Sequence, residues 1–192
     1  MFIPLPGYEF GVNSSYSFVV VFLFSALNSY AIVLAGLASN SRFSLIGGIR
    51  AIAQLISYEI PLSVSLLTLF CIQGSYNLHS FAVSKIIYIA VSLPAVAVFA
   101  ISLLAETNRT PFDLPEAEAE LVAGYNLEYS SILFSLFFLA EYSNILLAAS
   151  LMSLLIFNGM WFYPGVIFFC LLTIALRAIL PRYTFAHLIE LC

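Results

Sequence analysis

Long apolar runs alternate with short polar connections along this chain, which is the pattern of a protein that crosses a membrane several times. Five of these runs are long enough to cross a hydrocarbon core of about 30 Å as helices. The expected spans are residues 17–38, 51–72, 86–105, 130–157 and 164–180. We therefore predict an all-α, polytopic membrane helix bundle with about five transmembrane helices, forming one membrane domain over residues 1–192.

Two of the expected spans contain an acidic residue near the middle, Glu59 and Glu141. An acid near the centre of a membrane helix costs about 2.5 to 3.5 kcal/mol on insertion scales. Each carboxyl group could simply be protonated and hydrogen-bonded to a neighbouring helix, but ionisable residues inside a membrane are functional by default. Pro61 predicts a kink beside Glu59 that opens space for water. Asn28 and Ser29, inside the first span, are expected to face other helices because lipid offers them no partners.

The connections between the runs are polar or aromatic. Residues 39–50 are expected to form a short polar connection, and they contain Arg42 and Arg50. Trp161, Phe162 and Tyr163 precede the last span, and such clusters are typical of the interface between membrane and water.

The longest connection, residues 106–129, holds six of the ten acidic residues of the chain. These are Glu106, Asp113, Glu116, Glu118, Glu120 and Glu128, accompanied by Arg109. Asp113 and Glu116 have the spacing of a capping box, which predicts a short helix after an irregular stretch. A solvated loop would have the same composition, but the flanking apolar residues favour partial burial. A partly buried carboxylate cluster is suited to proton exchange.

Basic residues are few and lie mostly on one side of the predicted topology. Arg42, Arg50, Arg109, Arg177 and Arg182 fall on the face that carries the acidic connection, and only Lys85 falls on the other. The positive-inside rule places the first face in the cytoplasm or the mitochondrial matrix. Arg42 and Arg50 could be topology anchors alone, whereas Arg109 can pair with the surrounding carboxylates.

Composition supports a membrane protein and argues against several functions. Hydrophobic residues make up 62% of the chain and charged residues 8%, against about a quarter charged in soluble domains. Six basic residues leave no patch for nucleic acid. The three cysteines show no C-x-x-C spacing and the two histidines lie on opposite predicted faces, so we expect no metal site and no redox centre in this chain alone.

Several blocks of the chain resemble subunit 1 of respiratory complex I, the proton-pumping NADH:quinone oxidoreductase, and the bacterial counterpart of that subunit. The run from Glu106 to Ser131 resembles the signature loop of the family. Further blocks similar to the family's spans, in chain order, contain Tyr30, Leu34, Gly36, Asn40, Gly48, Arg50, Gln54, Tyr58, Glu59, Ala140, Glu141, Tyr142, Asn144, Arg177, Pro181, Arg182 and Tyr183.

The resemblance implies a membrane-arm subunit of the mitochondrial inner membrane or the bacterial plasma membrane. It implies that the acidic connection and nearby span ends help form the quinone chamber, with Phe112 and Tyr125 as candidate quinone contacts beside more ordinary packing roles. Ubiquinone would be the substrate, and FMN and iron–sulfur clusters would reside in partner subunits. Glu106 would belong to this loop and the quinone chamber. From their depth and their side of the membrane, we expect Asp113, Glu116, Glu118, Glu120 and Glu128 to form, with Glu141 and Glu59, a path that couples quinone reduction to proton movement.

The chain also departs from that family. It has no counterparts of the first two spans or the last, so we expect a separate polypeptide to supply the N-terminal spans. In the tail, Thr184, Ala186 and His187 replace the usual Arg and Asp-Gln pair. A secondary proton or cation transporter, an ion-pumping hydrogenase subunit and a scaffold remain as alternatives, although no internal repeat typical of transporters is found.

Overall fold

The described part of the computed structural model comprises residues 17–74, 86–107, 112, 129–157 and 161–181. Within these residues the chain forms five helices and no strand. They are α1 (Ser17–Ala38), α2 (Arg42–Gln73), α4 (Ile86–Glu106), α6 (Ser131–Ile156) and α7 (Phe162–Ile179). The prediction of an all-α bundle is confirmed.

Four of these helices are long and apolar enough to cross a membrane, over Val19–Ala38, Arg42–Ile72, Ser131–Ile156 and Phe162–Ile179. In α4 the segment Leu93–Glu106 is also apolar. The outer faces of the bundle are apolar and exposed, whereas a soluble protein would place polar residues there. The chain is therefore an integral membrane protein.

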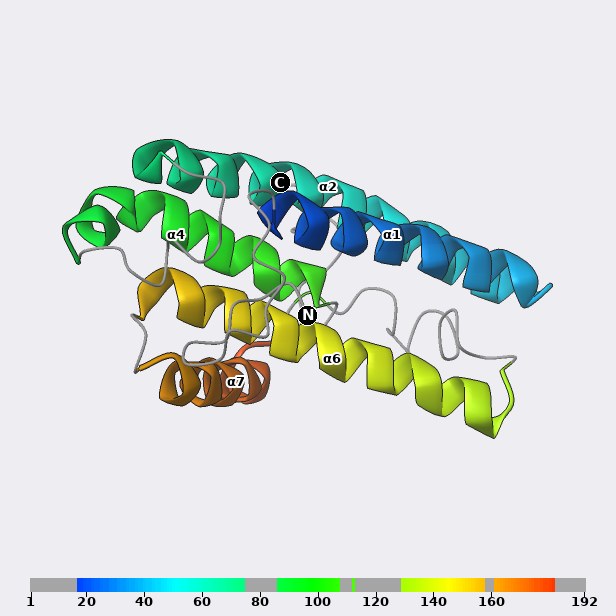
Figure 1. The fold of residues 1–192 in the computed structure, drawn as a ribbon. Coiled ribbons are helices and arrows are strands. Elements are labelled where there is room, and N and C mark those ends of the chain that lie inside the picture. Colours follow the sequence, from blue (N-terminus) through cyan, green and yellow to red (C-terminus); the bar gives the residue numbers. More distant parts are fainter. Residues whose placement is uncertain (1–16, 75–85, 108–111, 113–128, 158–160, 182–192) are drawn as a thin grey trace.

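Helices α1, α2, α4 and α6 run in alternating directions along a common axis, and α7 is inclined to it (Figure 1). Helix α1 ends, and α2 and α6 begin, at one end of the bundle, while α4 and α7 begin near the other end. The strongest packing is between neighbours in the sequence: α1 with α2, α2 with α4, and α6 with α7. Short connections between antiparallel membrane helices produce this order.

Helix α2 begins nine residues earlier than expected, so the prediction of a polar connection over residues 39–50 is wrong from Arg42 onward. Asn40 adopts a left-handed backbone with φ of 52° and makes the turn. Ser41 then caps the helix, because its side chain accepts a hydrogen bond from the Ser44 backbone N–H at 3.3 Å. The helix continues unbroken through Pro61 to Gln73.

Glycines bring α1 and α2 into close contact near this turn. A Cβ atom added to Gly36 would lie 3.4 Å from the Cα of Gly48, so the two backbones are almost in contact. Small residues permit such an approach between membrane helices, where lipid removes most of the hydrophobic driving force and packing dominates. Gly36 and Gly48 therefore serve a helix–helix contact.

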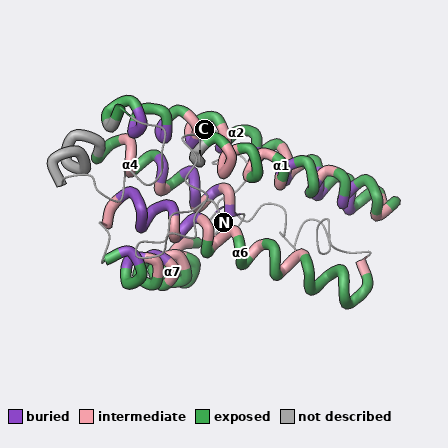
Figure 2. Tube along the Cα trace, in the orientation of Figure 1, coloured by how far each residue is buried: buried purple, intermediate pink, exposed green. Residues whose placement is uncertain are grey.

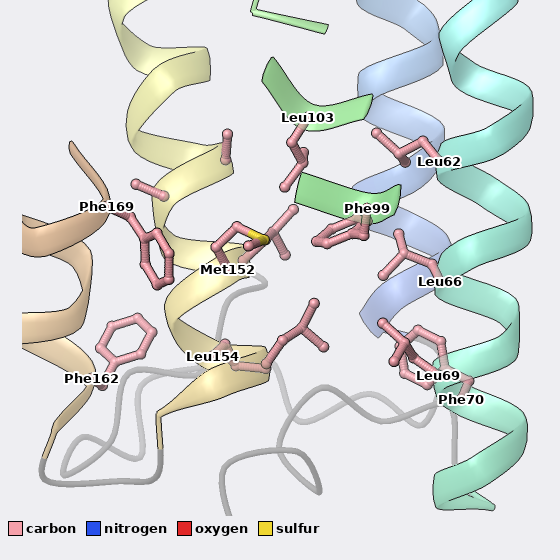
Figure 3. Packing of buried hydrophobic residues seen from close by; sticks show 14 residues of the cluster. Leu62, Leu66, Leu69, Phe70, Phe99, Leu103, Met152, Leu154, Phe162 and Phe169 are labelled. Carbon is pink, nitrogen blue, oxygen red and sulfur yellow. The ribbon is translucent and has the colours of Figure 1, made fainter. Parts of the chain in front are cut away.

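The main core lies between α2, α4, α6 and α7, where side chains from the four helices converge (Figure 3). Phe99 of α4 is fully buried between Leu66 of α2 and Met152 of α6. Phe162 and Phe169 of α7 close the cluster on the other side of α6. Phe162 is 4% exposed, so it is a core residue, whereas its neighbours Trp161 and Tyr163 are exposed as expected of an interfacial pair.

Burial is uneven along α6. Its C-terminal half is buried in the core, while the first half is mostly exposed (Figure 2), including Ile132 at 74% and Leu139 at 69%. Side chains in that half face lipid or another polypeptide when the protein is in a membrane.

The α6–α7 hairpin supplies a sharp test of the packing. A Cβ atom at Gly165 would lie 2.6 Å from Ser153 Oγ and from Phe157 Cδ2. Ser153 Oγ donates a 2.7 Å hydrogen bond to the Phe162 carbonyl, which joins the two helices. We predict that Gly165→Ala displaces Ser153, breaks this bond and lowers the free energy of unfolding by about 1–3 kcal/mol, measured as a lower midpoint of thermal unfolding in detergent.

Ser143→Ala is the control on the same hairpin, because Ser143 is exposed on α6 and its hydroxyl group donates a hydrogen bond to the Ala140 carbonyl of its own helix. Its midpoint is expected to equal or exceed that of the unmodified protein, since alanine favours helix over serine. Equal midpoints for the two variants would contradict the packing described for the hairpin.

Candidate functional site

A partly open cavity between α1, α2 and α4 contains two carboxyl groups. Glu59 of α2 and Glu106 of α4 both line it, together with Ser25, Ser29, Leu55 and Leu62. The empty space within it, counted together with the open solvent at its mouth, is about 280 Å³. Two acids and two hydroxyl groups thus share one space in a bundle whose main core is apolar.

Each helix presents its cavity residues through its own periodicity. Leu55, Glu59 and Leu62 are four and three residues apart, so they share one face of α2. Ser25 and Ser29 lie one turn apart on α1. Their hydroxyl groups donate to the carbonyls of Phe22 at 2.9 Å and of Ala26 at 2.7 Å. A serine oxygen that donates in this way still has lone pairs with which to accept a proton donor from the cavity.

Glu106 lies between helices, although it begins the acidic connection. Helix α4 ends alongside Gln54 of α2, whose side chain donates a hydrogen bond to the Ala105 carbonyl next to Glu106. Glu106 therefore faces the same cavity as Glu59, and Coulombic repulsion acts between the two groups when both are ionised.

A second cavity adjoins the first and is almost entirely apolar. It has an empty volume of about 460 Å³ and shares Ser25, Leu62 and Glu106 with the first. Its other lining side chains are Val21, Phe22, Leu66, Phe70, Phe99, Leu103, Leu147, Leu151 and Leu155. Glu106 thus stands where a polar space meets an apolar one, and water or a proton donor is favoured only on the Glu59 side.

The amide of Gln54 binds two backbone carbonyls, one in the last turn of α4 and one at Phe112. Gln54 is 3% exposed, and its Nε2 donates to the carbonyl of Ala105 at 3.1 Å and to that of Phe112 at 2.7 Å. The Phe112 ring is 4% exposed and lies against Tyr58, with 5.5 Å between the ring centroids. In the described residues, Phe112 therefore packs within the protein.

Tyr129 anchors the other end of the acidic connection. Its hydroxyl group donates a 2.7 Å hydrogen bond to the Ala35 carbonyl of α1, and its ring contacts Phe137 with centroids 5.1 Å apart. The start of α6 is thereby joined to the end of α1. Both ends of the acidic connection are hydrogen-bonded to the helices that carry the cavity or lie beside it.

The remaining predicted residues divide into two groups. Arg42 and Arg50 lie in the first turns of α2 and Arg177 in the last turn of α7, while Glu141 is half-buried on α6 and lines neither of the two cavities described above. The others lie outside the described residues: Arg109, Asp113, Glu116, Glu118, Glu120, Tyr125, Glu128 and Arg182. The tail positions Thr184, Ala186 and His187 are also outside them.

Sequence reasoning missed Ser25, Gln54 and Tyr58 as parts of this site, while Ser29 was correctly expected to face another helix. The four-residue spacing of Ser25 and Ser29 was a detectable signal. Gln54 and Tyr58 belong to the blocks that resemble the family, but the contacts of Gln54 could not be read from spacing, because its two partners lie 51 and 58 residues away. Among the described residues, no group of three potential ligands is placed to hold a metal ion.

Comparison with known proteins agrees with this architecture. The family model described as "NADH dehydrogenase" matches residues 1–192. The chain belongs to this family. Among curated relatives, it is 43% identical over 189 residues to NADH-ubiquinone oxidoreductase chain 1 of Triticum aestivum, covering 89% of this chain and 58% of that protein.

Two other relatives show the same partial coverage of longer proteins. The chain is 44% identical over 188 residues to an NADH-quinone oxidoreductase subunit of the bacterium Paramagnetospirillum magneticum, covering 89% of this chain and 55% of the relative. It is 39% identical over 206 residues to NADH-ubiquinone oxidoreductase chain 1 of Cyanidium caldarium, covering 98% and 60%. The chain therefore spans a little over half the length of these members of the NADH dehydrogenase family.

The buried position of Phe112 predicts a structural role for this residue in a chain whose relatives are named as quinone oxidoreductases. We predict that Phe112→Ala opens a void beside Tyr58 and destabilises the local structure by about 3 kcal/mol or more. Digestion by a glutamate-specific protease in membranes then becomes faster in residues 106–129. Phe134→Ala, at a ring that is 42% exposed on α6, is the control and leaves the rate unchanged. Equal rates in the two variants would show that Phe112 does not anchor the segment.

Proposed function

We propose that this chain is a membrane-arm subunit of a proton-pumping NADH:quinone oxidoreductase, respiratory complex I. The family match over residues 1–192 and the names of the relatives support the assignment, and the membrane-spanning helices agree with it. In this proposal the chain carries no electron centre. Partner subunits of the complex hold FMN and the iron–sulfur clusters, and ubiquinone is the substrate that they reduce.

The observation that carries a role in proton movement is the cavity shared by Glu59 and Glu106. Two carboxyl groups in one membrane-embedded space can exchange a proton through water or through the serine hydroxyl groups beside them. The two groups also repel each other when both are ionised. This is the electrostatic coupling that a pump requires.

The rest of the proposed path extends in two directions from that cavity. Toward the membrane surface it continues into the acidic connection, from Asp113 through Glu116, Glu118 and Glu120 to Glu128. Glu141 on α6 is proposed as a further station, although it lines neither of the described cavities. Arg109, Tyr125, Arg42, Arg50, Arg177 and Arg182 belong to the proposed quinone chamber and its surroundings.

We propose that the acidic connection faces the mitochondrial matrix or the bacterial cytoplasm. Arg42 begins α2 at the end of the bundle where α1 ends and α6 begins, and Arg177 lies in the last turn of α7. Positive residues concentrate on that side of a membrane protein. The membrane is then the mitochondrial inner membrane or the bacterial plasma membrane.

Replacement of the two cavity acids tests this function. We predict that Glu59→Gln and Glu106→Gln, in the assembled complex, each lower the number of protons moved per NADH oxidised by about tenfold. The double variant is expected to be no worse than either single one, because the two groups act as a unit and their effects are not additive. Proton uptake by inside-out membrane vesicles, divided by NADH oxidation, gives the ratio.

Ser57→Ala is the matched control for these variants. Ser57 lies on the same helix as Glu59 and is exposed. Its hydroxyl group donates a hydrogen bond to the Ala53 carbonyl of that helix. NADH oxidation with ferricyanide, an artificial acceptor, checks that electron entry is intact. Normal pumping in both Gln variants would remove Glu59 and Glu106 from the path and contradict the proposed role of the cavity.

A further inference from the structure

Gln54 occupies an unusual position for an amide side chain in a membrane helix. It is 3% exposed, and its Nε2 donates hydrogen bonds to two backbone carbonyls from other parts of the chain. Ala105 O lies in the last turn of α4, where carbonyls have no partner within the helix. Phe112 O lies beyond the helix. One side chain therefore satisfies two backbone carbonyls, that of Ala105 at the end of α4 and that of Phe112 beyond it.

The partners of Gln54 are direct neighbours of the acids in the proposed path. Ala105 directly precedes Glu106, and Phe112 directly precedes Asp113 in the sequence. On α2 itself, Gln54 lies one turn before Tyr58 and five residues before Glu59. The Gln54 amide thus joins α2, which carries Glu59, to the backbone next to Glu106.

Apolar contacts reinforce this connection. The Phe112 ring packs against Tyr58, and Tyr58, Ala105 and Phe112 form one small buried cluster with Leu104 at its edge. The hydrogen bonds of Gln54 therefore lie in surroundings of low polarity, where a bond is stronger than in water and the loss of a donor is costly. Gln54 has little freedom to move independently of the end of α4.

We propose that Gln54 is a positioning residue for proton coupling, whose amide holds Glu106 at the distance from Glu59 that their shared cavity requires. This inference rests on the proposed function of the cavity. Without the amide, the last turn of α4 is free to move away from α2 and to take the Glu106 carboxyl group with it. Proton exchange between the acids then fails more often, while electrons still reach quinone.

The test compares Gln54→Met with Ser57→Ala in the assembled complex. Methionine keeps the length of the side chain and removes both donors. We expect Gln54→Met to lower the protons moved per NADH oxidised by at least about fivefold, which corresponds to the lower bound for the loss of two hydrogen bonds. Ser57→Ala is expected to keep the full ratio. A residue needed only for assembly would change the amount of complex but not this ratio.

Gln54→Asn provides a second variant in case the methionine variant does not assemble. It keeps an amide in the core but is shorter by one methylene group, so it cannot reach both carbonyls, and the ratio is again expected to fall. A full ratio in Gln54→Asn would then overturn the proposal.

The two proposals fail in different ways. A full ratio in Gln54→Met with a reduced ratio in Glu59→Gln and Glu106→Gln would overturn the role of Gln54 and leave the proposed function intact. Full ratios in the Gln54 and glutamate variants together would overturn both.

Discussion

The structure depends on the placement of two carboxyl groups in a space that apolar helices enclose. Glu59 and Glu106 come from different helices and line one cavity with two serine hydroxyl groups. Acids inside a membrane are costly unless polar groups surround them, so the local arrangement of α1, α2 and α4 has to supply such groups. The hydroxyl groups of Ser25 and Ser29 do so from α1, while Gln54 holds the end of α4 against α2.

Packing elsewhere in the bundle holds these helices in place. Close contact of Gly36 and Gly48 sets the spacing of α1 and α2, and Phe99 fills the space between α2 and α6. The α6–α7 hairpin completes the core from the other side through Ser153 and Phe162. The polar cavity and the apolar core meet at Glu106. The C-terminal part of α4 therefore contributes side chains both to the core and to the cavity of the two acids.

Much of the fold could be predicted from hydrophobic runs alone, because a membrane helix needs an uninterrupted apolar segment of defined length. The bounds of α1 agree with prediction, and those of α4, α6 and α7 agree to within two residues. Helix α2 is longer than predicted because residues 39–50, with Arg42 and Arg50, suggested a polar connection, whereas the chain is helical from Arg42 onward. Among the residues of the candidate site, Glu59 was predicted because it is an acid within a long apolar run. The position of Glu106 beside Glu59 was not predictable, since it depends on contacts between Gln54 and residues more than fifty positions away.

Infrared difference spectroscopy of the carboxyl bands tests the central claim most directly, because it observes the protons of Glu59 and Glu106 themselves. Spectra of the assembled complex would be compared between the unmodified protein, Glu59→Gln, Glu106→Gln and the double variant, with hydrogen–deuterium exchange to identify carboxyl signals. If the two groups share one cavity, removal of either shifts the band of the other, so the single-variant changes do not sum to the change in the double variant. Independent bands whose losses simply add, as for two separate groups, would contradict the account.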